Sequence, residues 1–545
     1  MDSTNWARII IGALVDGGVD HFFISPGYRD VPLITALNQE SSVTLLSCFD
    51  ERAAGFAAIS YGQATGRAAA LVCTSGTAGA NYLPAVVEAY EAGIPLIVLT
   101  ADRPVELSVL GANQTTKQLN FFSDFINAVI GLEAPNVQFE KIQLRETVKA
   151  GLRQTLIPTR GPVQINIPLR APLEPIEKIS DLPVRQKYCN ELSDIIASEK
   201  SLLRIEDQFQ SGQRVLVLVG RLPQEKCKAQ LSNFLQRQDI PFYLDICSSL
   251  CLDGSLNDPE IAWQRKLISE NPPDIVIQFG SNPVSKYWHQ LFKKINIKKL
   301  FLFNDEKKSL NTQALDGEQV YCNDFDFLKT WDLMPWSYPE LSYYKKSANQ
   351  LVEEFSLSWA AIAKAVLSSS QQTLFLANSS AVRAFDTWVF QHFNARRVYT
   401  QRGVSGIEGH CASGLGLAMA TVEPVDVVLG DVALLHDLNS LFLLAQAKKP
   451  VRVICVNNQG GKIFAKLPIA EYPEVVSPFV DTPHDFRFSQ VAKAAQITYY
   501  HCSDRESLES ALVQTTSQLA LIEVSLETEK DLALMLAISR LEYLS

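Results

Sequence analysis

The side chains best spaced to hold a metal ion are a carboxylate and an amide in the last third of the chain. Asp431 directly follows the apolar run 425–430, and Asn458 follows the apolar run 451–457. If both runs are strands of one parallel sheet, their carboxyl ends meet at the edge where ligands bind. A carboxylate, an amide oxygen and a backbone carbonyl from the glycine-rich turn that follows Asn458 are hard ligands of the kind that Mg²⁺ prefers. Either half alone is more typical of a helix cap or a polar turn, whereas the pair favours a site for a metal and a diphosphate.

Glu51 is a second candidate, because it opens a segment rich in Ala and Gly that is typical of a helix. A glutamate at the start of a helix is common for electrostatic reasons alone, so Glu51 by itself does not indicate catalysis. The turn Thr74-Ser75-Gly76 follows the next apolar run, and its glycine allows the backbone to approach a flat ring closely.

A third irregular loop, residues 402–409, holds three glycines and precedes a helix that we expect to start near Ala412. Its aliphatic Ile407 is large enough to brace a bound ring. The following residues 413–418 read Ser-Gly-Leu-Gly-Leu-Ala, which suggests a dinucleotide fingerprint. They follow no strand and lack the third glycine, so we interpret these glycines as serving helix packing.

Short apolar runs that alternate with helical patterns must position these groups, and they predict buried parallel sheets covered by helices. We expect strands in three sets, at 69–73, 95–99 and 161–168, then at 214–220, 240–244, 274–279 and 299–303, then at 373–376, 425–429, 451–456 and 519–524. A helix is expected over 78–92. A Pro-rich linker over 172–187 and an aromatic connector around 331–344 separate the sets. The expected fold is therefore α/β, with three parallel-sheet domains at 1–175, 190–345 and 346–545.

Composition narrows the class of protein. The 545 residues are 47% apolar and 20% charged, as in an ordinary globular protein. The net charge of −10 argues against nucleic acid as a partner. The ten cysteines have no zinc-site spacing and a chain of this length needs no disulfides, so we expect reduced thiols in the cytoplasm. No run of about 18 uninterrupted apolar residues predicts a membrane span, and the N-terminus lacks the basic start of a signal peptide.

The motifs occur in the order found in thiamine-diphosphate enzymes, which the chain resembles over nearly its whole length. Among these it most resembles the family of 2-succinyl-5-enolpyruvyl-6-hydroxy-3-cyclohexene-1-carboxylate (SEPHCHC) synthases of menaquinone biosynthesis. The motifs that carry the resemblance are Ser25-Pro-Gly-Tyr-Arg29, Phe49-Asp-Glu-Arg52, Thr100-Ala-Asp-Arg-Pro104, Gly111-Ala-Asn-Gln114, Asn378-Ser379 with Arg383, Arg402-Gly403 with Ser405-Gly-Ile407, His436-Asp-Leu-Asn439, and Asn457-Asn458 through Ile463-Phe464 and Leu467-Pro468. Two residues depart from the family's pattern: Tyr28 stands where Ser is usual, and Tyr287 follows Lys286.

The resemblance implies decarboxylation of 2-oxoglutarate on thiamine diphosphate and 1,4-addition of the succinyl-semialdehyde carbanion to isochorismate. It implies Glu51 as the catalytic carboxylate, which bonds the aminopyrimidine ring. It implies Asp431, Asn458 and the carbonyl of Gly460 as ligands of Mg²⁺ or Mn²⁺. The residues that it assigns to thiamine diphosphate are Glu51, Thr74, Ser75, Gly76, Ser405, Ile407, Gly430, Asp431, Asn458, Ile463 and Phe464. Those that it assigns to substrates are Ser379, Arg383 and Arg402 for the 2-oxoglutarate carboxylate, Arg29, Arg103, Asn113, Gln114 and Lys286 for isochorismate, and Leu467.

Both implied substrates are dicarboxylic acids, so several cations must converge on one pocket, and Arg offers a bidentate fork that Lys cannot. An isolated Arg is usually a solvated surface charge, but these lie within matched motifs. The family implies a homodimer or homotetramer with active sites between subunits. Two alternatives stay open: a thiamine-diphosphate carboligase with a different acceptor, which Tyr28 suggests, and an acetolactate-synthase-like enzyme. A third, a non-catalytic cofactor-binding protein, is disfavoured because Glu51, Asp431 and Asn458 are all retained.

Overall fold

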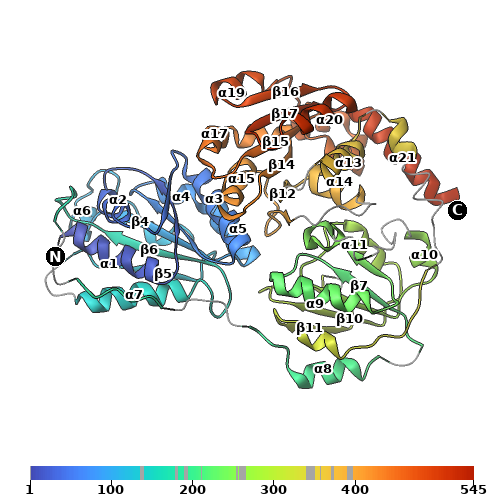
Figure 1. Cartoon of the computed structure of the whole chain (residues 1–545), viewed down its shortest axis with the longest axis horizontal. Helices are drawn as coiled ribbons and strands as arrows, with labels where there is room; N and C mark the ends of the chain where they lie inside the picture. The colour runs from blue at the N-terminus through green and yellow to red at the C-terminus, as the bar shows by residue number, and fades with distance from the viewer. Residues whose placement is uncertain are drawn as a thin grey trace. The chain divides into compact units, whose positions relative to one another are not determined.

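Three sheets of parallel strands with helices between them make up the fold of the computed structural model (Figure 1), which confirms the expected α/β class. The structure describes residues 2–135, 140–177, 182–188, 194–209, 212–252, 256, 265–312, 314–338, 350–355, 357–369, 373–388 and 397–544. The chain forms two compact units. Unit 1 comprises residues 1–193, 401–422 and 436–451, and unit 2 comprises residues 194–400, 423–435 and 452–545.

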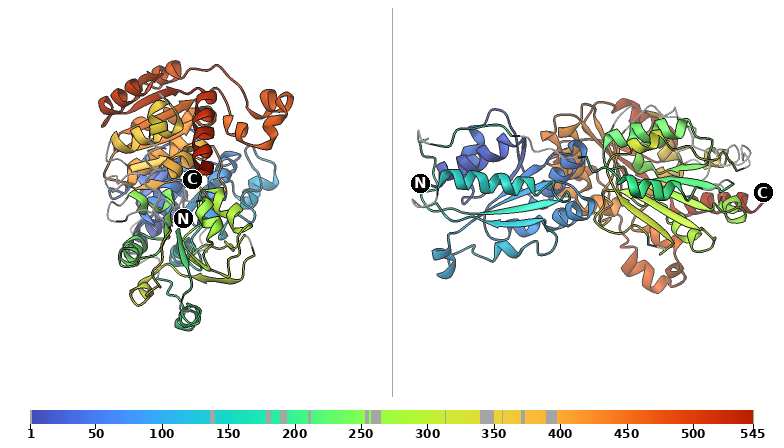
Figure 2. Two further views of the ribbon diagram at one scale, coloured as in Figure 1. Left: turned by 90° about the vertical axis from the view of Figure 1, so that its right-hand side faces the viewer. Right: turned by 90° about the horizontal axis from the view of Figure 1, so that it is seen from below.

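The sheet of unit 1 has six strands in the order β2-β1-β3-β4-β6-β5. Their bounds are β1 (His21–Ser25), β2 (Thr44–Ser47), β3 (Ala69–Cys73), β4 (Leu96–Asp102), β5 (Ala128–Gly131) and β6 (Pro162–Pro168). One face is covered by α1 (Ser3–Asp16), α2 (Val31–Asn38) and α7 (Lys141–Arg153). Helices α1 and α7 lie side by side there, blue and teal in the right-hand view of Figure 2. The opposite face receives α3 (Glu51–Thr65), which packs on β1, β3 and α5 (Leu83–Ala92).

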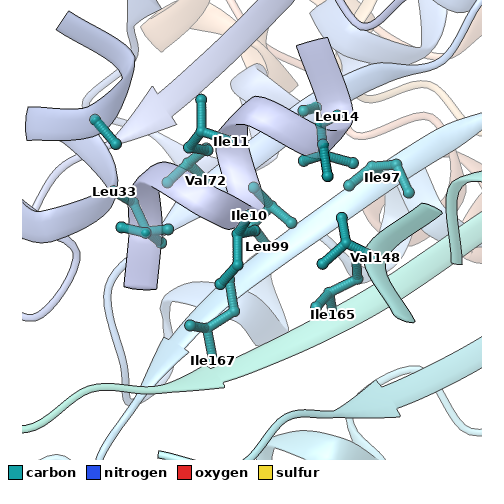
Figure 3. Packing of buried hydrophobic residues seen from close by; sticks show 14 of the residues in the cluster. Ile10, Ile11, Leu14, Leu33, Val72, Ile97, Leu99, Val148, Ile165 and Ile167 are labelled. Carbon is teal, nitrogen blue, oxygen red and sulfur yellow. The ribbon is translucent and has the colours of Figure 1, made fainter. Parts of the chain in front are cut away.

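Alternation along the strands builds the core under α1, because successive side chains of a strand point to opposite faces. Leu99 of β4 and Ile165 of β6 meet Ile10 of α1, Leu33 of α2 and Val148 of α7 in one buried apolar cluster (Figure 3). All five side chains are fully buried. This core fixes the sheet whose carboxyl edge carries the candidate residues of unit 1.

The expected single helix over 78–92 is wrong, because the chain forms two helices there. Helix α4 ends at Asn81 and α5 begins at Leu83. Pro84 explains the break, since proline has no N–H for the preceding turn and is tolerated only in the first turn of a helix.

Helix α15 (His410–Ala420) packs closely against α3 within unit 1. A Cβ on Gly416 would lie 2.0 Å from the carbonyl oxygen of Ala57, and one on Gly409 would lie 2.0 Å from Phe56 Cγ. These contacts leave room only for glycine, so the interpretation that the glycines of 413–418 serve helix packing is confirmed at Gly416. The contact places the start of α15 against α3, whose first residue is Glu51.

Unit 2 contains two sheets. The first has the strand order β11-β10-β9-β7-β8, with β7 (Val215–Val219), β8 (Phe242–Leu244), β9 (Ile275–Phe279), β10 (Lys299–Asn304) and β11 (Gly317–Tyr321). The second, orange to red in Figure 1, has the order β13-β12-β14-β15-β17-β16. Its strands are β12 (Thr373–Leu376), β13 (Val398–Tyr399), β14 (Val425–Gly430), β15 (Val451–Asn457), β16 (Thr498–Cys502) and β17 (Ala520–Ser525). The helices that matter for the site are α11 (Lys286–Phe292), α14 (Ser380–Trp388) and α16 (Asp431–His436).

The expected linker and connector are partly visible. Of the linker, residues 182–188 lie against α1, where Arg185 Nε donates to Asp16 Oδ1 at 2.9 Å, while 178–181 lie outside the described residues. In the connector, Trp336 Nε1 donates to the carbonyl of Val215 at 2.8 Å, while 339–344 lie outside them. Among the helices that the structure describes, none is long and apolar enough to cross a membrane.

Candidate active site

The expected metal site lies where two neighbouring strands of unit 2 end. Strands β14 and β15 are adjacent, and Arg452 on β15 forms a fully buried ion pair with Asp426 on β14 at 2.6 Å. Asp431 follows β14 and is 2% exposed. Its Oδ2 accepts hydrogen bonds from the backbone amides of Asn458 at 3.1 Å and Gly460 at 3.0 Å. The sequence therefore predicted correctly that these three residues meet at one sheet edge.

The residues at this edge fit a hard divalent cation beside a diphosphate. A Cβ on Gly430 would meet nothing within 4 Å, so there is open space at the end of β14. The side chain of Asn458 makes no hydrogen bond to any residue that the structure describes, so its amide oxygen is available as a ligand. Within the described ranges, no three His, Cys, Asp or Glu side chains form a metal-binding group. One carboxylate, one amide and one backbone carbonyl therefore need further oxygens, such as those of a diphosphate, to complete the coordination of Mg²⁺.

Two further groups at this edge were missed by the sequence analysis. His484 Nε2 lies 3.4 Å from Asp431 Oδ2, and its side chain is 5% exposed. The Asp481 carboxylate forms an ion pair with Lys462 Nζ at 2.7 Å. The backbone carbonyl of Asp481 accepts a hydrogen bond from the amide of Gly461 at 2.6 Å. Segment 481–484 therefore packs on the glycine-rich turn. Burial raises the pKa of Asp431, against which its backbone hydrogen bonds and the charge of His484 act.

Glu51 is the first residue of α3 in unit 1, because the side chain of Asp50 caps that helix by accepting from the amide of Ala53 at 3.2 Å. Glu51 is half-buried, and burial raises its pKa, with the negative charge of Asp50 adding to the effect. Asp50 Oδ2 also accepts from Asn439 Nδ2 at 2.9 Å, and Arg52 Nη2 donates to the carbonyl of His436 at 2.7 Å. Two motifs almost 400 residues apart along the chain therefore meet beside Glu51.

Asp30 is a buried carboxyl close to Glu51 that the sequence analysis missed. It is fully buried, and its Oδ1 accepts from the amide of Gly27 at 2.8 Å. Burial raises the pKa of Asp30 to about 7. Burial also raises the pKa of the Cys73 thiol, followed by the charges of Asp30 and Glu51, so the three groups share one neighbourhood. Asp30 is thus poised to hold a proton near neutral pH.

The turn 74–76, after β3, is hydrogen-bonded to Arg103, a residue that we expect to bind isochorismate. The guanidinium of Arg103 donates to Ser75 Oγ, to the carbonyl of Gln114 at 3.2 Å and to Gln114 Oε1 at 3.1 Å. Arg29 lies nearby, since burial and then the charge of Arg103 lower its pKa. Gly76 has a φ of +93° and donates its amide to Gln118 Oε1 at 2.8 Å. Five of the predicted residues are thus assembled on one edge of the first sheet, namely Arg29, Ser75, Gly76, Arg103 and Gln114.

Gln118 is a buried amide that supports this edge, and the sequence analysis missed it. Its Nε2 donates to the carbonyl of Ala101 at 3.1 Å and to Asn166 Oδ1 at 3.0 Å. Asn166 in turn donates to Asp102 Oδ2 at 2.9 Å, directly before Arg103. Because every hydrogen-bonding group of the Gln118 amide has a partner, its orientation is fixed. Only the glutamine's position four residues after Gln114 could have suggested it.

The loop 402–409 is anchored by another carboxylate that the sequence analysis missed. Glu88 on α5 is 2% exposed, and its two oxygens accept from the amides of Gly403 and Val404, each at 2.8 Å. Arg402 precedes these amides and Ser405 follows them. A Cβ on Gly403 would lie 2.9 Å from the Glu88 carbonyl oxygen, so the loop lies directly on α5.

In unit 2, the structure also brings together Ser379 and Arg383. Arg383 lies one turn into α14, and its guanidinium donates to the carbonyl of Ser379. Lys286 is the exposed first residue of α11, and Leu467 is 46% exposed. The backbone amide of Leu467 donates to the carbonyl of Phe464 at 3.0 Å. Among the described residues, no hydrogen bond or ion pair joins Lys286 or Asn113 to another predicted site residue.

The remaining predicted residues lie at a strand end, in loop 402–409 or in a short helix. Thr74 follows β3, Ser405 and Ile407 lie in loop 402–409, and Ile463 and Phe464 lie in the short helix η7 (Lys462–Lys466).

Four predicted loops share an unusual backbone conformation. Gln114, Ser379, Ser405 and Gln459 have φ angles of 60°, 70°, 60° and 61°. The left-handed region is uncommon for residues other than glycine and costs of order 1–3 kcal/mol. Such strain gathers at functional sites because the surrounding structure must enforce it.

Comparisons with known proteins agree with this geometry. The family model described as the thiamine pyrophosphate enzyme N-terminal TPP binding domain matches residues 4–122, and that of the C-terminal TPP binding domain matches residues 384–524. The 2-succinyl-5-enolpyruvyl-6-hydroxy-3-cyclohexene-1-carboxylate synthase of Syntrophus aciditrophicus (strain SB) is 34% identical, over 97% of this chain and 96% of the relative. The chain belongs to the SEPHCHC synthase family.

Other SEPHCHC synthases are similar over the same span. The synthase of Chlorobium phaeobacteroides (strain BS1) is 32% identical, over 97% of this chain and 96% of its own. That of Chlorobium phaeovibrioides (strain DSM 265 / 1930) is 30% identical, over 96% and 94%. The chain is therefore a thiamine-diphosphate-dependent enzyme, a transferase that forms carbon–carbon bonds, and the resemblance seen in its motifs is confirmed.

Proposed function

We propose that this SEPHCHC synthase family member converts 2-oxoglutarate and isochorismate into 2-succinyl-5-enolpyruvyl-6-hydroxy-3-cyclohexene-1-carboxylate and CO₂, in menaquinone biosynthesis. The observation that carries the proposal is full-length similarity to synthases of that name. The two clusters of candidate residues support it, one around Asp431 and one around Arg103 and Glu51.

When bound, thiamine diphosphate would supply a ring carbon that becomes a nucleophile for the keto carbon once it has lost its proton, and a ring that accepts the electron pair left by decarboxylation. Asp431, Asn458 and the carbonyl of Gly460 hold Mg²⁺ or Mn²⁺ beside the diphosphate, and Gly430 leaves the space for it. The Glu51 carboxyl forms a hydrogen bond with a ring nitrogen of the cofactor, and burial raises the pKa of this carboxyl from its ordinary value. Thr74, Ser75, Gly76, Ser405, Ile407, Ile463 and Phe464 line the remaining cofactor surface.

The arginines bind the substrate carboxylates and orient them. Arg383, with Ser379, and Arg402 bind the carboxylate of 2-oxoglutarate, and Arg103 and Arg29 bind isochorismate, because a guanidinium fork matches a carboxylate in charge and geometry. The remaining substrate residues of the proposal are Asn113, Gln114, Lys286 and Leu467. Ser75 and Gln114 pre-set the orientation of Arg103, which lowers the entropy lost on binding.

A different acceptor is the second candidate function, because Tyr28 departs from the family's pattern. The Tyr28 side chain is 64% exposed, and its hydroxyl donates to Glu174 Oε1 at 2.5 Å. It is therefore held at the surface, which favours an acceptor pocket of ordinary width and so isochorismate.

We further propose a homodimer or homotetramer with active sites between subunits, working in the cytoplasm. Large apolar side chains are exposed beside both candidate clusters, namely Val109 (81%) and Leu110 (80%) next to the Arg103 cluster and Phe479 (77%) next to the glycine-rich turn. Adjoining exposed apolar side chains, such as Val109 and Leu110, are typical of protein interfaces. Nine cysteines in the described ranges are free and buried, as suits a reducing compartment.

The test is turnover by the purified protein with thiamine diphosphate and Mg²⁺. With both substrates, isochorismate should be consumed and CO₂ released in equal amounts, and neither should occur when 2-oxoglutarate is omitted. CO₂ release without isochorismate loss would point to another acceptor, and use of pyruvate would point to an acetolactate-synthase-like activity.

A Glu51→Gln variant tests the catalytic carboxylate. It should lower kcat by about 10²-fold or more, because loss of a positioned acid–base group has that effect. Glu199→Gln is the matched control, since Glu199 also opens a helix, α8 (Glu199–Glu206), but lies on the surface. Equal kcat values for wild type and Glu51→Gln would refute the role of Glu51.

A further inference from the structure

On the basis of the proposed function, we propose that Asp245 and Asp386 are positioning residues that hold the substrate cations Lys286 and Arg383. All four residues lie in unit 2. The proposal gives the sheet of β7–β11 a part in catalysis beyond carrying Lys286.

Asp245 pins the loop that leads to Lys286. It follows β8, caps the short helix η2 (Ile246–Ser248) and is 1% exposed. Its Oδ1 accepts from the amide of Cys247 at 2.8 Å, and its Oδ2 accepts from the amide of Val284 at 2.6 Å. Val284 lies two residues before Lys286. One buried carboxylate therefore joins η2 to the chain that enters α11.

This anchor matters because no hydrogen bond or ion pair holds the Lys286 side chain among the residues that the structure describes. Lys286 is exposed and is the first residue of α11, where Ser285 caps the helix. A lysine side chain has four rotatable bonds, so the position of its charge depends first on where the backbone holds its Cα. The next turn of α11 is held as well, because the Trp288 ring lies against the Tyr243 ring, with centroids 5.0 Å apart.

Asp386 ties the helix of Arg383 to the same segment. Its Oδ2 accepts from the Tyr243 hydroxyl at 2.6 Å, and its Oδ1 accepts from the amide of Ile246 at 3.0 Å. Asp386 lies three residues after Arg383 on α14, which is nearly one helical turn. Residues 243–247 thus form a shared support, with the loop of Lys286 on one side and the helix of Arg383 on the other.

Asp245 accepts backbone amides at a buried position where apolar packing would serve stability more simply, and Asp386 does so at a partly buried one. The core beside them is apolar, with Leu218, Val276 and Leu302 among its members. Burying a carboxylate carries a desolvation cost, and replacing buried ionic groups by apolar ones is often neutral or stabilising. Directional hydrogen bonds, in contrast, fix two loops relative to each other, which is what two cations that must meet one substrate pair require.

Asp245→Asn is the direct test. The new amide group cannot accept from one of the two backbone amides, so the loop before α11 loses an anchor. The KM for isochorismate should rise about tenfold, the effect of losing one hydrogen bond to a charged group. CO₂ release from 2-oxoglutarate without acceptor should stay near the wild-type rate, because it does not use Lys286.

Asp386→Asn and Tyr243→Phe test the other side. Both should raise the KM for 2-oxoglutarate by about three- to tenfold. Tyr243→Phe keeps the ring contact with Trp288 and buries no new polar group, so it decides the matter if either asparagine variant does not fold. Asp324→Asn is the matched control: this carboxylate of the same unit accepts from Lys226 Nζ at 2.8 Å and Gln230 Nε2 at 2.9 Å. It should lower the melting temperature and leave both KM values unchanged.

Folded variants with wild-type KM values for both substrates would overturn the proposal, and so would equal KM increases in Asp324→Asn. A failure of the proposed function looks different. In that case the wild type would not consume isochorismate, or Lys286→Ala and Arg383→Ala would leave both KM values unchanged.

Discussion

Glu88→Gln should loosen the loop that carries Arg402, Ser405 and Ile407. In the folded chain, each oxygen of the Glu88 carboxylate accepts one backbone amide, from Gly403 and from Val404, at 2.8 Å. Glutamine keeps one acceptor and turns an NH₂ group toward the other amide. A hydrogen bond to a charged group contributes about 1.5–3 kcal/mol, so the equilibrium between anchored and detached loop should shift by roughly 10- to 150-fold.

The measurements are the Kd for thiamine diphosphate, by titration calorimetry, and the KM for 2-oxoglutarate. Both should rise by about tenfold or more, since each depends on the anchored loop. Asp16→Asn is the matched control, because Asp16 is also a buried carboxylate of unit 1 that accepts a backbone amide, from Gln186 at 3.1 Å, but it lies on α1. It should lower stability without changing either constant. A Glu88→Gln variant with both constants at wild-type values would refute the anchoring role.

Two further predictions concern the metal edge and a buried acid. Gly460→Ala should destabilise the fold by roughly 2–4 kcal/mol, because the φ of Gly460 is +138° and the new Cβ would lie 2.4 Å from the Asp481 carbonyl oxygen. The same variant should weaken Mn²⁺ binding measured by electron paramagnetic resonance. Gly430→Ala is the control: its Cβ would lie in open space, so the melting temperature should stay unchanged. Asp30→Asn should gain stability relative to wild type as pH rises from about 4 to 7. The folded-state pKa of Asp30 is about 7 against an ordinary 3.8, so the folded wild type alone keeps the proton in that window and loses up to roughly 4 kcal/mol across it. Thermal melts at pH 4, 5.5, 7 and 8 check the sign, and parallel curves for the two proteins would contradict it.

The interior strands could be predicted from the sequence because a strand buried on both faces is an almost unbroken apolar run. Strands β3 and β12 have the predicted bounds, β9 and β15 differ from prediction by one residue at one end, and β7 is one residue shorter than predicted at each end. The missed strands are mostly at sheet edges, as with β2, β5, β11, β13 and β16. Edge strands are partly exposed and short, so their composition does not separate them from loops. Strand β1 is an exception: it is interior, and its five residues were missed beside the Ser25-Pro26-Gly27 turn.

The candidate site followed the same division. Asp431 and Asn458 could be placed together because each follows a predicted strand. The carboxyl ends of parallel strands lie at the same edge of a sheet. Three supporting residues could not be predicted, namely Glu88, Gln118 and Asp245. Each forms hydrogen bonds with backbone groups that lie far away in the sequence. A lone Glu, Gln or Asp in a sequence carries no mark of such a partner. Tertiary packing alone decides whether it is a solvated surface group or a buried anchor.

Glycine substitutions would relieve backbone strain at four positions, because glycine adopts a positive φ at little cost. These positions are Gln114, Ser379, Ser405 and Gln459. Such replacements would raise the melting temperature but would also let the backbone of these loops adopt other conformations. At these positions, a gain in thermal stability should carry the largest loss of activity. A variant selected for heat tolerance alone would therefore lose activity most readily through changes here.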